Sequence, residues 1–509
     1  MRKTKAFEQY EAGIAYKRRI GLYETVGRNR RFYGGDQWGS SGADRALPKP
    51  VFNVVRRVTD YLVGAVAGGK MTVHYLDYPR TPGTKEQEEA IKAGLALFNR
   101  HVAYRWENCH MDRLTYRLLL DAALSGDGVL YSYWDAQAEG GGDIRTVVWD
   151  SCDLYAADMN RADIQSQEYI LLAGRERVAS LRREARAAGV TEDQLAHIRP
   201  DASTLLGEGR RSAPELEEDD QAKTTVVLKF WKQDGEVWLE KATREVVIRR
   251  VATGMHLYPI AYFNWMPTYG SFHGTSPVSS MIANQKYINR AYAMMMKHMT
   301  DTAFSKIIYD KSRIPEWTNE VGEAIAAVGG NLADAVQVVG TGEMQDGYMA
   351  LIESAISATK EMMGATDTVL GSAQASNTSA ILALQEASRT ALQGVCGAYQ
   401  QCIEELADIW ADMLFAVCGD KAVLPLIDGG GVLSEVDLDM LRHCCLRARV
   451  EVGNLTQYSA SGTQNVLEHL LDGGHITLHQ YLEQLPEGVL PMRAVLMEQC
   501  QAKEDVYGE

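Results

Sequence analysis

The feature that most constrains this chain is an unbroken apolar stripe between residues 379 and 418, at the spacing of an α-helix. Its members recur every three or four positions: Ile381, Leu384, Ala391, Leu392, Val395, Tyr399, Cys402, Ile403, Leu406, Ile409, Trp410, Met413, Leu414 and Val417. At about 1.5 Å per residue, a continuous helix over this range is roughly 60 Å long. One compact domain seldom supplies neighbours along such a length, so the stripe predicts packing against other copies of the chain.

The length of the chain, 509 residues, exceeds the roughly 250–300 residues over which a single core usually grows, so at least two packed units are expected. No segment reaches the roughly 18 apolar residues that a membrane-spanning helix needs. The best candidate, residues 51–67, is interrupted by Asn53, Arg56, Arg57 and Asp60. No apolar run follows the basic start, so we expect no signal peptide and a protein that stays where it is made.

The charge is distributed unevenly along the chain. The whole sequence carries a formal charge of −15, whereas residues 1–60 hold 13 Lys and Arg against 6 Asp and Glu. Proteins that grip nucleic acid usually carry a basic footprint, so the overall charge disfavours tight DNA binding. The basic start has two interpretations, a solvated helical face or docking onto an acidic neighbouring surface.

The sequence contains no motif that indicates catalysis, a cofactor or a metal site. It has no G-x-x-x-x-G-K-[S/T] phosphate loop and no G-x-S-x-G nucleophile elbow. His475 and His479 stand four residues apart, but His475 precedes the capping Thr477 and no third ligand is obvious. The eight cysteines include no C-x-x-C pair, which is typical of thiols in a reducing cytoplasm. We therefore predict a protein that is not an enzyme and that binds no metal and no cofactor.

The first 265 residues combine helical and strand patterns. Apolar spacing predicts helices over residues 7–32, 51–67 and 85–125. The period then changes to two, which predicts strands over residues 129–134, 144–149, 169–173, 225–231, 237–240 and 246–251. An acidic, Gly- and Ser-containing segment at 201–222 is predicted to be a surface loop. This half is therefore predicted to form an α+β unit.

The second half is predicted to be mostly helical. Ser276-Pro277 is a capping residue followed by proline at the first helical position, and it opens a Met-rich helix. Strands are predicted at 306–309 and 335–339, with a short helix at 317–328 between them. A second long helix runs from 345 to 363 and is closed by Gly364. Further along, we predict a strand at 446–452 and short helices at 461–471 and from Thr477 onward.

Taken in order, these landmarks resemble the phage portal protein family. The opening resembles that family at residues 29–38 (Asn-Arg-Arg-Phe-Tyr-Gly-Gly-Asp-Gln-Trp) and at Pro50-Val-Phe-Asn53. The centre resembles it at Gly274-Thr-Ser-Pro277 and at Gln285-Lys-Tyr-Ile-Asn289. The closing segment is similar at 452–453, 464–465, 476–477 and 481–482. The resemblance extends over nearly the whole chain and depends on the order of the motifs.

The resemblance implies a mainly helical portal fold of the α+β class, with a mixed α/β wing, a two-helix stem, a small α/β clip, a long wing helix and a short helical crown. By position, the wing is 1–265 and 419–455, the stem helices are 266–305 and 345–366, the clip is 306–344, the tunnel loop is 367–379, the long wing helix is 380–418 and the crown is 456–509. A crown region this short makes a long crown barrel unexpected.

Portal proteins form the ring-shaped DNA channel at a capsid vertex, usually from about twelve subunits. The resemblance therefore implies roles in genome packaging, head–tail joining and DNA ejection. It places the protein in the virion after assembly in the host cytoplasm, away from membranes. The implied partners are other copies of the chain, the terminase packaging motor, head-completion or adaptor proteins, and the major capsid and scaffolding proteins. Double-stranded DNA would pass through without sequence-specific binding, and an acidic subunit suits a channel through which DNA slides.

Two sets of candidate site residues follow from this resemblance. In the clip, a charged rim beside an aromatic anchor is expected to contact the motor or head-completion proteins: Lys311, Arg313, Glu316 and Trp317. The alternative is that Trp317 fills the base of its own clip. In the tunnel loop, small polar side chains are expected to line the channel: Ser372, Gln374, Ser376, Asn377 and Thr378. The alternative there is a hinge without a role.

Two other functions stay open on the sequence alone. One is a different virion structural protein, such as a head–tail connector, although these are usually shorter and lack the helix–clip–helix order. The other is a cytoplasmic enzyme with an unrecognised site, which would need an acid–base cluster that the sequence does not reveal.

Overall fold

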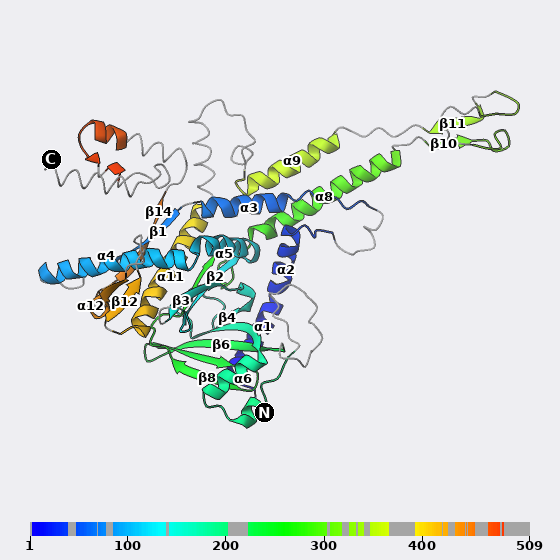
Figure 1. Ribbon diagram of the computed structural model, residues 1–509. Coiled ribbons are helices and arrows are strands. Elements are labelled where there is room, and N and C mark those ends of the chain that lie inside the picture. Colours follow the sequence, from blue (N-terminus) through cyan, green and yellow to red (C-terminus); the bar gives the residue numbers. More distant parts are fainter. Residues whose placement is uncertain are drawn as a thin grey trace.

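The computed structural model describes residues 3–38, 47–68, 70–77, 85–138, 142–201, 222–302, 306–317, 325–331, 334–339, 347–365, 392–419, 421–425, 433–442, 444, 446–453, 467–478 and 481–482. Helices and strands are both abundant in these residues, so the α+β class is confirmed. Figure 1 shows a mixed body of helices and small sheets, from which a pair of helices carries a β-hairpin outward.

Three helices open the chain: α1 (Lys5–Arg19), α2 (Leu22–Tyr33) and α3 (Val54–Ala67). The prediction of one helix over 7–32 was wrong, because Gly21 adopts a left-handed conformation with φ of 66° and breaks it. Asn53 caps α3, since its Oδ1 accepts a hydrogen bond from the backbone N of Arg56 at 3.0 Å. The basic start of the sequence therefore folds as two separate helices.

The predicted helix over 85–125 is also two helices, α4 (Lys85–Asn108) and α5 (Met111–Ser125). His110, with φ of 51°, takes the left-handed conformation at the junction. Neither glycine nor proline marks this break, so helical periodicity alone did not reveal it.

Two larger sheets form the centre of the body. The three-stranded sheet has the order β3-β2-β9 and contains β2 (Asp127–Asp135), β3 (Asp143–Val148) and β9 (Ile260–Asn264). The five-stranded sheet has the order β4-β5-β6-β7-β8, with β4 (Leu154–Ala156), β5 (Tyr169–Arg177), β6 (Lys223–Gln233), β7 (Glu236–Ala242) and β8 (Val247–Ala252). All six strands predicted in this half are confirmed, whereas β4 and β9 were not anticipated.

A small second core packs against the five-stranded sheet. It is built by α6 (Val178–Ala187) and α7 (Glu192–Leu195), neither of which was predicted from the sequence. Leu181 and Ile198 are fully buried there against Ile248 of β8. Burial of these apolar side chains supplies the driving force that holds the two helices on the sheet.

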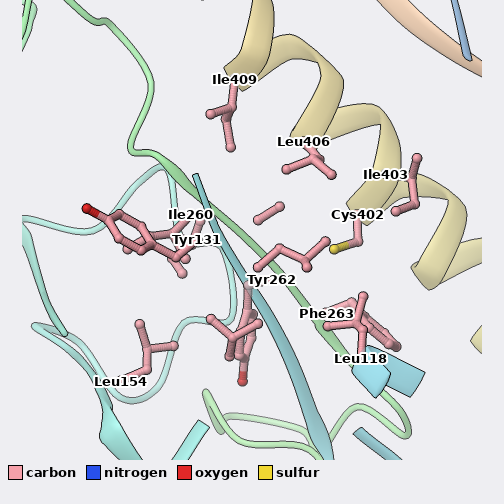
Figure 2. Close-up of a cluster of buried hydrophobic side chains, with 14 of the residues drawn as sticks. Leu118, Tyr131, Leu154, Ile260, Tyr262, Phe263, Cys402, Ile403, Leu406 and Ile409 are labelled. Carbon is pink, nitrogen blue, oxygen red and sulfur yellow. The ribbon is translucent and has the colours of Figure 1, made fainter. Parts of the chain in front are cut away.

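Helix α11 (Gln393–Val417) is the central element of the main core, and Figure 2 shows its apolar side chains facing β2 and β9. Trp410 is 1% exposed, and its indole Nε1 donates to Thr146 Oγ1 at 3.0 Å. The helix begins at Gln393 and not at Ser379, and the residues immediately before Leu392 lie outside the described range. For Leu392 to Leu414 the inference that the stripe needs other copies to cover it was wrong, because the subunit itself buries this part, whereas Ile381 to Ala391 lie outside the described residues.

Two segments far apart in the sequence form a two-stranded sheet: β1 (Lys70–Asp77) pairs antiparallel with β14 (Leu446–Gly453). Helix side chains bond to backbone groups on both edges of this sheet. Asn99 of α4 accepts from Tyr75 N at 2.7 Å, while Asp408 of α11 accepts from Ala448 N at 2.9 Å. At Tyr75 and Ala448, these side chains occupy backbone groups that another strand would need for pairing. The predicted strand at 446–452 is confirmed.

A β-hairpin and a short helix precede β14. The hairpin consists of β12 (Lys421–Pro425) and β13 (Leu433–Asp437), and the helix is α12 (Leu438–Arg442). Met440 and Leu441 of α12 lie against Gly94 of α4, where a Cβ would stand 3.2 Å from Met440 Cε and 3.8 Å from Leu441 Cδ2. Near the C-terminus, the described residues 467–472 are helical, in agreement with the predicted helix at 461–471.

Lys17 is a fully buried cation that fastens α1 to the short helix η2 (Ser151–Asp153) and β4. Its Nζ donates to the carbonyl oxygens of Ser151 at 2.7 Å and Cys152 at 3.0 Å, and also to that of Leu154. Burial away from water lowers the pKa of Lys17 to about 8, although nearby carboxylates partly oppose this shift. The apolar stripe of α1 gives no hint of this buried amine.

Candidate assembly site: the arm and its tip

The arm consists of α8 (Pro277–Thr302) and α9 (Gly347–Met362), which pack against each other and run antiparallel (Figure 1). Asn284 Nδ2 of α8 donates to Thr359 Oγ1 of α9 at 3.1 Å. Ile288 of α8 and Ile352 of α9 are both buried. The helix start at Pro277 and a second helix within 345–363 are confirmed, whereas residues 266–276, which the resemblance assigned to the first stem helix, are not helical. Gly364, with φ of 70°, closes α9 as expected.

The root of the arm is fixed by Ser276. Its Oγ accepts from Val278 N at 3.1 Å, which caps α8, and donates to Ala123 O of α5 at 2.5 Å. The Gly-x-Ser-Pro motif therefore both starts the helix and ties it to the body. Gly274 is required as well, because a Cβ at this position would stand 2.7 Å from the carbonyl oxygen of Gly126.

A buried carboxylate, Asp127, organises the turn that leads into α8. Its Oδ1 accepts from Asn264 Nδ2 and from Gly274 N, both at 2.8 Å. Its Oδ2 lies 2.6 Å from His273 Nδ1. Burial lowers the pKa of His273, although the hydrogen bond with Asp127 partly opposes this, so the neutral ring is favoured. A neutral imidazole bonds this carboxylate only with its proton on Nδ1.

The Gln-x-x-x-Asn motif of α8 forms a second buried network with the opening of the chain. Gln285 Oε1 accepts from Val55 N at 3.1 Å, and its Nε2 donates to Asn289 Oδ1 at 2.8 Å. Asn289 Nδ2 then donates to Gln37 Oε1 at 2.7 Å. Gln37 continues the chain of bonds to Asn53 Oδ1 at 2.9 Å. The motifs at residues 29–38, 50–53 and 285–289 are thus one structural unit.

These networks explain what the sequence motifs do. Asn29 of α2 extends the same arrangement, since its Nδ2 donates to Leu124 O and Ser279 Oγ, both at 2.9 Å. Asp127, Asn264 and His273 were missed as contributors. The Gly126-Asp-Gly128 sequence is a signal for Asp127, because flanking glycines allow other backbone close to a carboxylate. The chemistry here is positioning of the arm.

Both helices of the arm expose large apolar side chains. The exposed set is Tyr287, Met294, Met296, Met299, Tyr348, Met349, Leu351 and Met362. Met362 and Met299 are 66% and 56% exposed, in contrast to the fully buried apolar residues of the body. Apolar surface of this extent usually marks a protein–protein contact.

The tip is a hairpin of β10 (Lys306–Tyr309) and β11 (Val336–Val339), as predicted. An Asp310 turn follows β10, in which Oδ1 accepts from Ser312 N at 2.9 Å. The predicted helix at 317–328 was wrong for the residues that can be judged, because Trp317 and residues 325–328 have no regular structure. Residues 318–324 lie outside the described ranges.

The four candidate residues of the clip fall into two groups. Lys311 and Glu316 are exposed. Arg313 instead supports the tip, since its guanidinium donates to Asn331 O at 3.0 Å and to Gly329 O. Trp317 stacks on Tyr309 with ring centroids 5.3 Å apart, which favours its role within the clip. The five tunnel-loop candidates, Ser372 to Thr378, lie outside the described residues.

The described part of the chain holds no cluster of three His, Cys, Asp or Glu side chains suited to a metal ion. Among its helices, none combines the length and apolar character needed to span a membrane. His475 is described and His479 is not, so the structure does not test that pair.

Comparison with known protein families supports one class of protein. The model of the phage P22-like portal protein family matches residues 187–433, a little under half of the chain, including β6 to β9, the arm, α11 and β12. The match supports a phage portal protein, in agreement with the resemblance seen in the sequence. No curated protein matches the chain. Portal proteins are structural rather than enzymatic, and the family implies an oligomeric ring at a virion capsid vertex.

Proposed function

We propose that this chain is the subunit of a ring-shaped portal through which DNA enters and leaves a phage capsid. The observation that carries the proposal is the set of large apolar side chains left exposed on α8 and α9 among the described residues. A ring of subunits would cover these faces on every copy, because each arm would lie between two others. The formal charge of −15 suits a channel that lets a polyanion slide without holding it.

Within this proposal, the parts of the chain take the roles implied by the resemblance. Residues 1–265 and 419–455 would form the wing, and the pairing of β1 with β14 is consistent with one unit built from both segments. The arm would be the stem, and its tip at 306–344 the clip. Residues 367–379 would line the tunnel, and 456–509 would form the crown. In this arrangement the portal would serve packaging, head–tail joining and DNA ejection.

Imaging of the purified protein tests the proposal directly. We expect negative-stain class averages to show closed rings of about twelve subunits with an axial channel. Light scattering should give a mass many times that of the 56.4 kDa chain. A monomer that persists across protein concentrations and salt conditions would contradict the proposed function.

The tip provides a second test, on contact with the packaging motor. Lys311→Glu reverses an exposed charge without touching the bonds that Arg313 makes to the tip backbone. Rings should form normally, while the amount of packaged DNA should fall roughly tenfold, because a reversed charge opposes docking of the motor. The matched control is Arg18→Glu, which reverses an exposed charge on α1. Equal packaging by the Lys311 and Arg18 variants would remove the proposed role of the tip.

A further inference from the structure

One side of α8 carries an exposed stripe made of Tyr287, Arg290 and Met294. The spacing of three and four residues places the three side chains in a line along the helix. Tyr287 and Met294 are 47% and 52% exposed. Within the described residues, Arg290 forms neither a hydrogen bond nor an ion pair. The stripe is thus an apolar–cationic–apolar surface whose Arg290 has no hydrogen-bond or ion-pair partner among the described residues of its own subunit.

Helix α9 carries a matching stripe of opposite charge: Met349, Glu353 and Ile356. Met349 and Glu353 are exposed, and Ile356 is half-buried. The carboxylate of Glu353 has no cationic partner in the part of the chain that the structure describes. The order along the helix is again apolar, charged, apolar.

The two stripes lie at the same heights along the arm. The Asn284–Thr359 hydrogen bond sets a common level for the antiparallel helices. Arg290 lies six residues beyond Asn284, and Glu353 lies six residues before Thr359, so both stand about 9 Å further toward the tip. Counted from the same hydrogen bond, Tyr287 stands level with Ile356, and Met294 stands level with Met349. Each member of one stripe therefore has a counterpart at its own level on the other.

The stripes face away from each other. At about 100° per residue, the α8 stripe lies roughly 60–120° to one side of Asn284 around the helix axis. Measured from Thr359 around the axis of α9, the α9 stripe is rotated by the same angles but in the opposite direction. Because the helices are antiparallel, rotations of opposite sign place the stripes on opposite faces of the arm. This geometry explains why Arg290 and Glu353, although level, do not pair within one subunit.

We propose that the α8 stripe of one copy docks on the α9 stripe of the next, with Arg290 paired to Glu353 between apolar contacts. The inference rests on the proposed ring. A closed ring needs two different, complementary faces on each subunit and has no rise along its axis, so residues at equal height meet when the arms run along that axis. The two stripes meet both requirements.

Charge reversal tests the pairing. Arg290→Glu alone and Glu353→Arg alone each place like charges at every contact, and we expect each to raise the concentration needed for rings roughly tenfold or more. An equal mixture of the two variants should restore rings, because alternating copies again present opposite charges. The Arg18→Glu variant, altered outside the arm, should assemble like the wild type.

Cross-linking supplies a second measurement. A protein with both Met294→Cys and Met349→Cys should give a ladder of covalent oligomers with a short bis-maleimide, because the two sites face different copies. Each single variant and the wild type, which has eight cysteines of its own, serve as controls. The inference would be overturned if the wild type formed rings, the single charge variants assembled equally well and no specific ladder appeared. The portal proposal would then still stand. Failure of the wild type to form rings would instead remove the portal proposal.

Discussion

Replacing the buried Asp127 with alanine is expected to lower the free energy of unfolding by about 3–5 kcal/mol. The carboxylate is 1% exposed and bonds Asn264, His273 and Gly274. Alanine would leave His273 Nδ1 and Gly274 N without the acceptor that compensates for their removal from water, whereas Asn264 Nδ2 keeps Tyr262 Oη and Phe272 O, both at 3.0 Å. Urea denaturation followed by circular dichroism measures the change.

The matched control is Asp135→Ala at the opposite end of β2. Asp135 is partly exposed and stands 3.8 Å from Arg145, so its loss should change stability by less than about 1 kcal/mol. Asp127→Asn retains one acceptor oxygen, so its loss of stability should lie between those of the two alanine variants. If the two alanine variants proved equally stable, the assignment of Asp127 as the organiser of the arm root would be wrong.

Lysines at Ser372, Gln374 and Asn377 are expected to stop DNA packaging while leaving rings intact. The segment 367–379 contains small uncharged polar residues and one acid, Asp367. If it lines the channel as proposed, each added cation would hold a passing phosphate by roughly a kilocalorie per mole through counterion release. With three per subunit around a ring, DNA movement should slow by far more than tenfold.

The measurement is the yield of nuclease-protected DNA, with electron microscopy of the rings alongside. Alanine at the same three positions is the control, because it removes the polar groups without adding charge. We expect packaging by the alanine variant to stay close to that of the wild type. Normal packaging by the lysine variant would show that the segment does not line the DNA path.

The sequence predicted those parts of this fold that depend on local patterns. The strands at 129–134 and 225–231 are rich in β-branched and aromatic residues, and the helix at Pro277 has its cap next to it in the chain. Such signals are local, because side-chain period and capping act over a few residues. The breaks at Gly21 and His110 were missed, since the apolar period continues across both.

The site itself was predictable only as a set of motifs. Gly274, Gln285 and Asn289 were singled out from the sequence, but their roles appear only when residues more than two hundred positions apart come together. Gln285 reaches Val55, and Asn289 reaches Gln37. Hydrogen bonds of this kind depend on the relative placement of helices, which no local pattern encodes.

The sequence by itself determined the class of fold, most strands and both arm helices, because each is set by side-chain period and by caps close in the chain. Only the tertiary structure decided which stripes are covered. The stripe of α11 is buried against β2 and β9, whereas Met294 and Met362 on the arm stay exposed. All of these stripes look alike in sequence, since apolar spacing shows that a helix has a face to bury and not which surface will bury it.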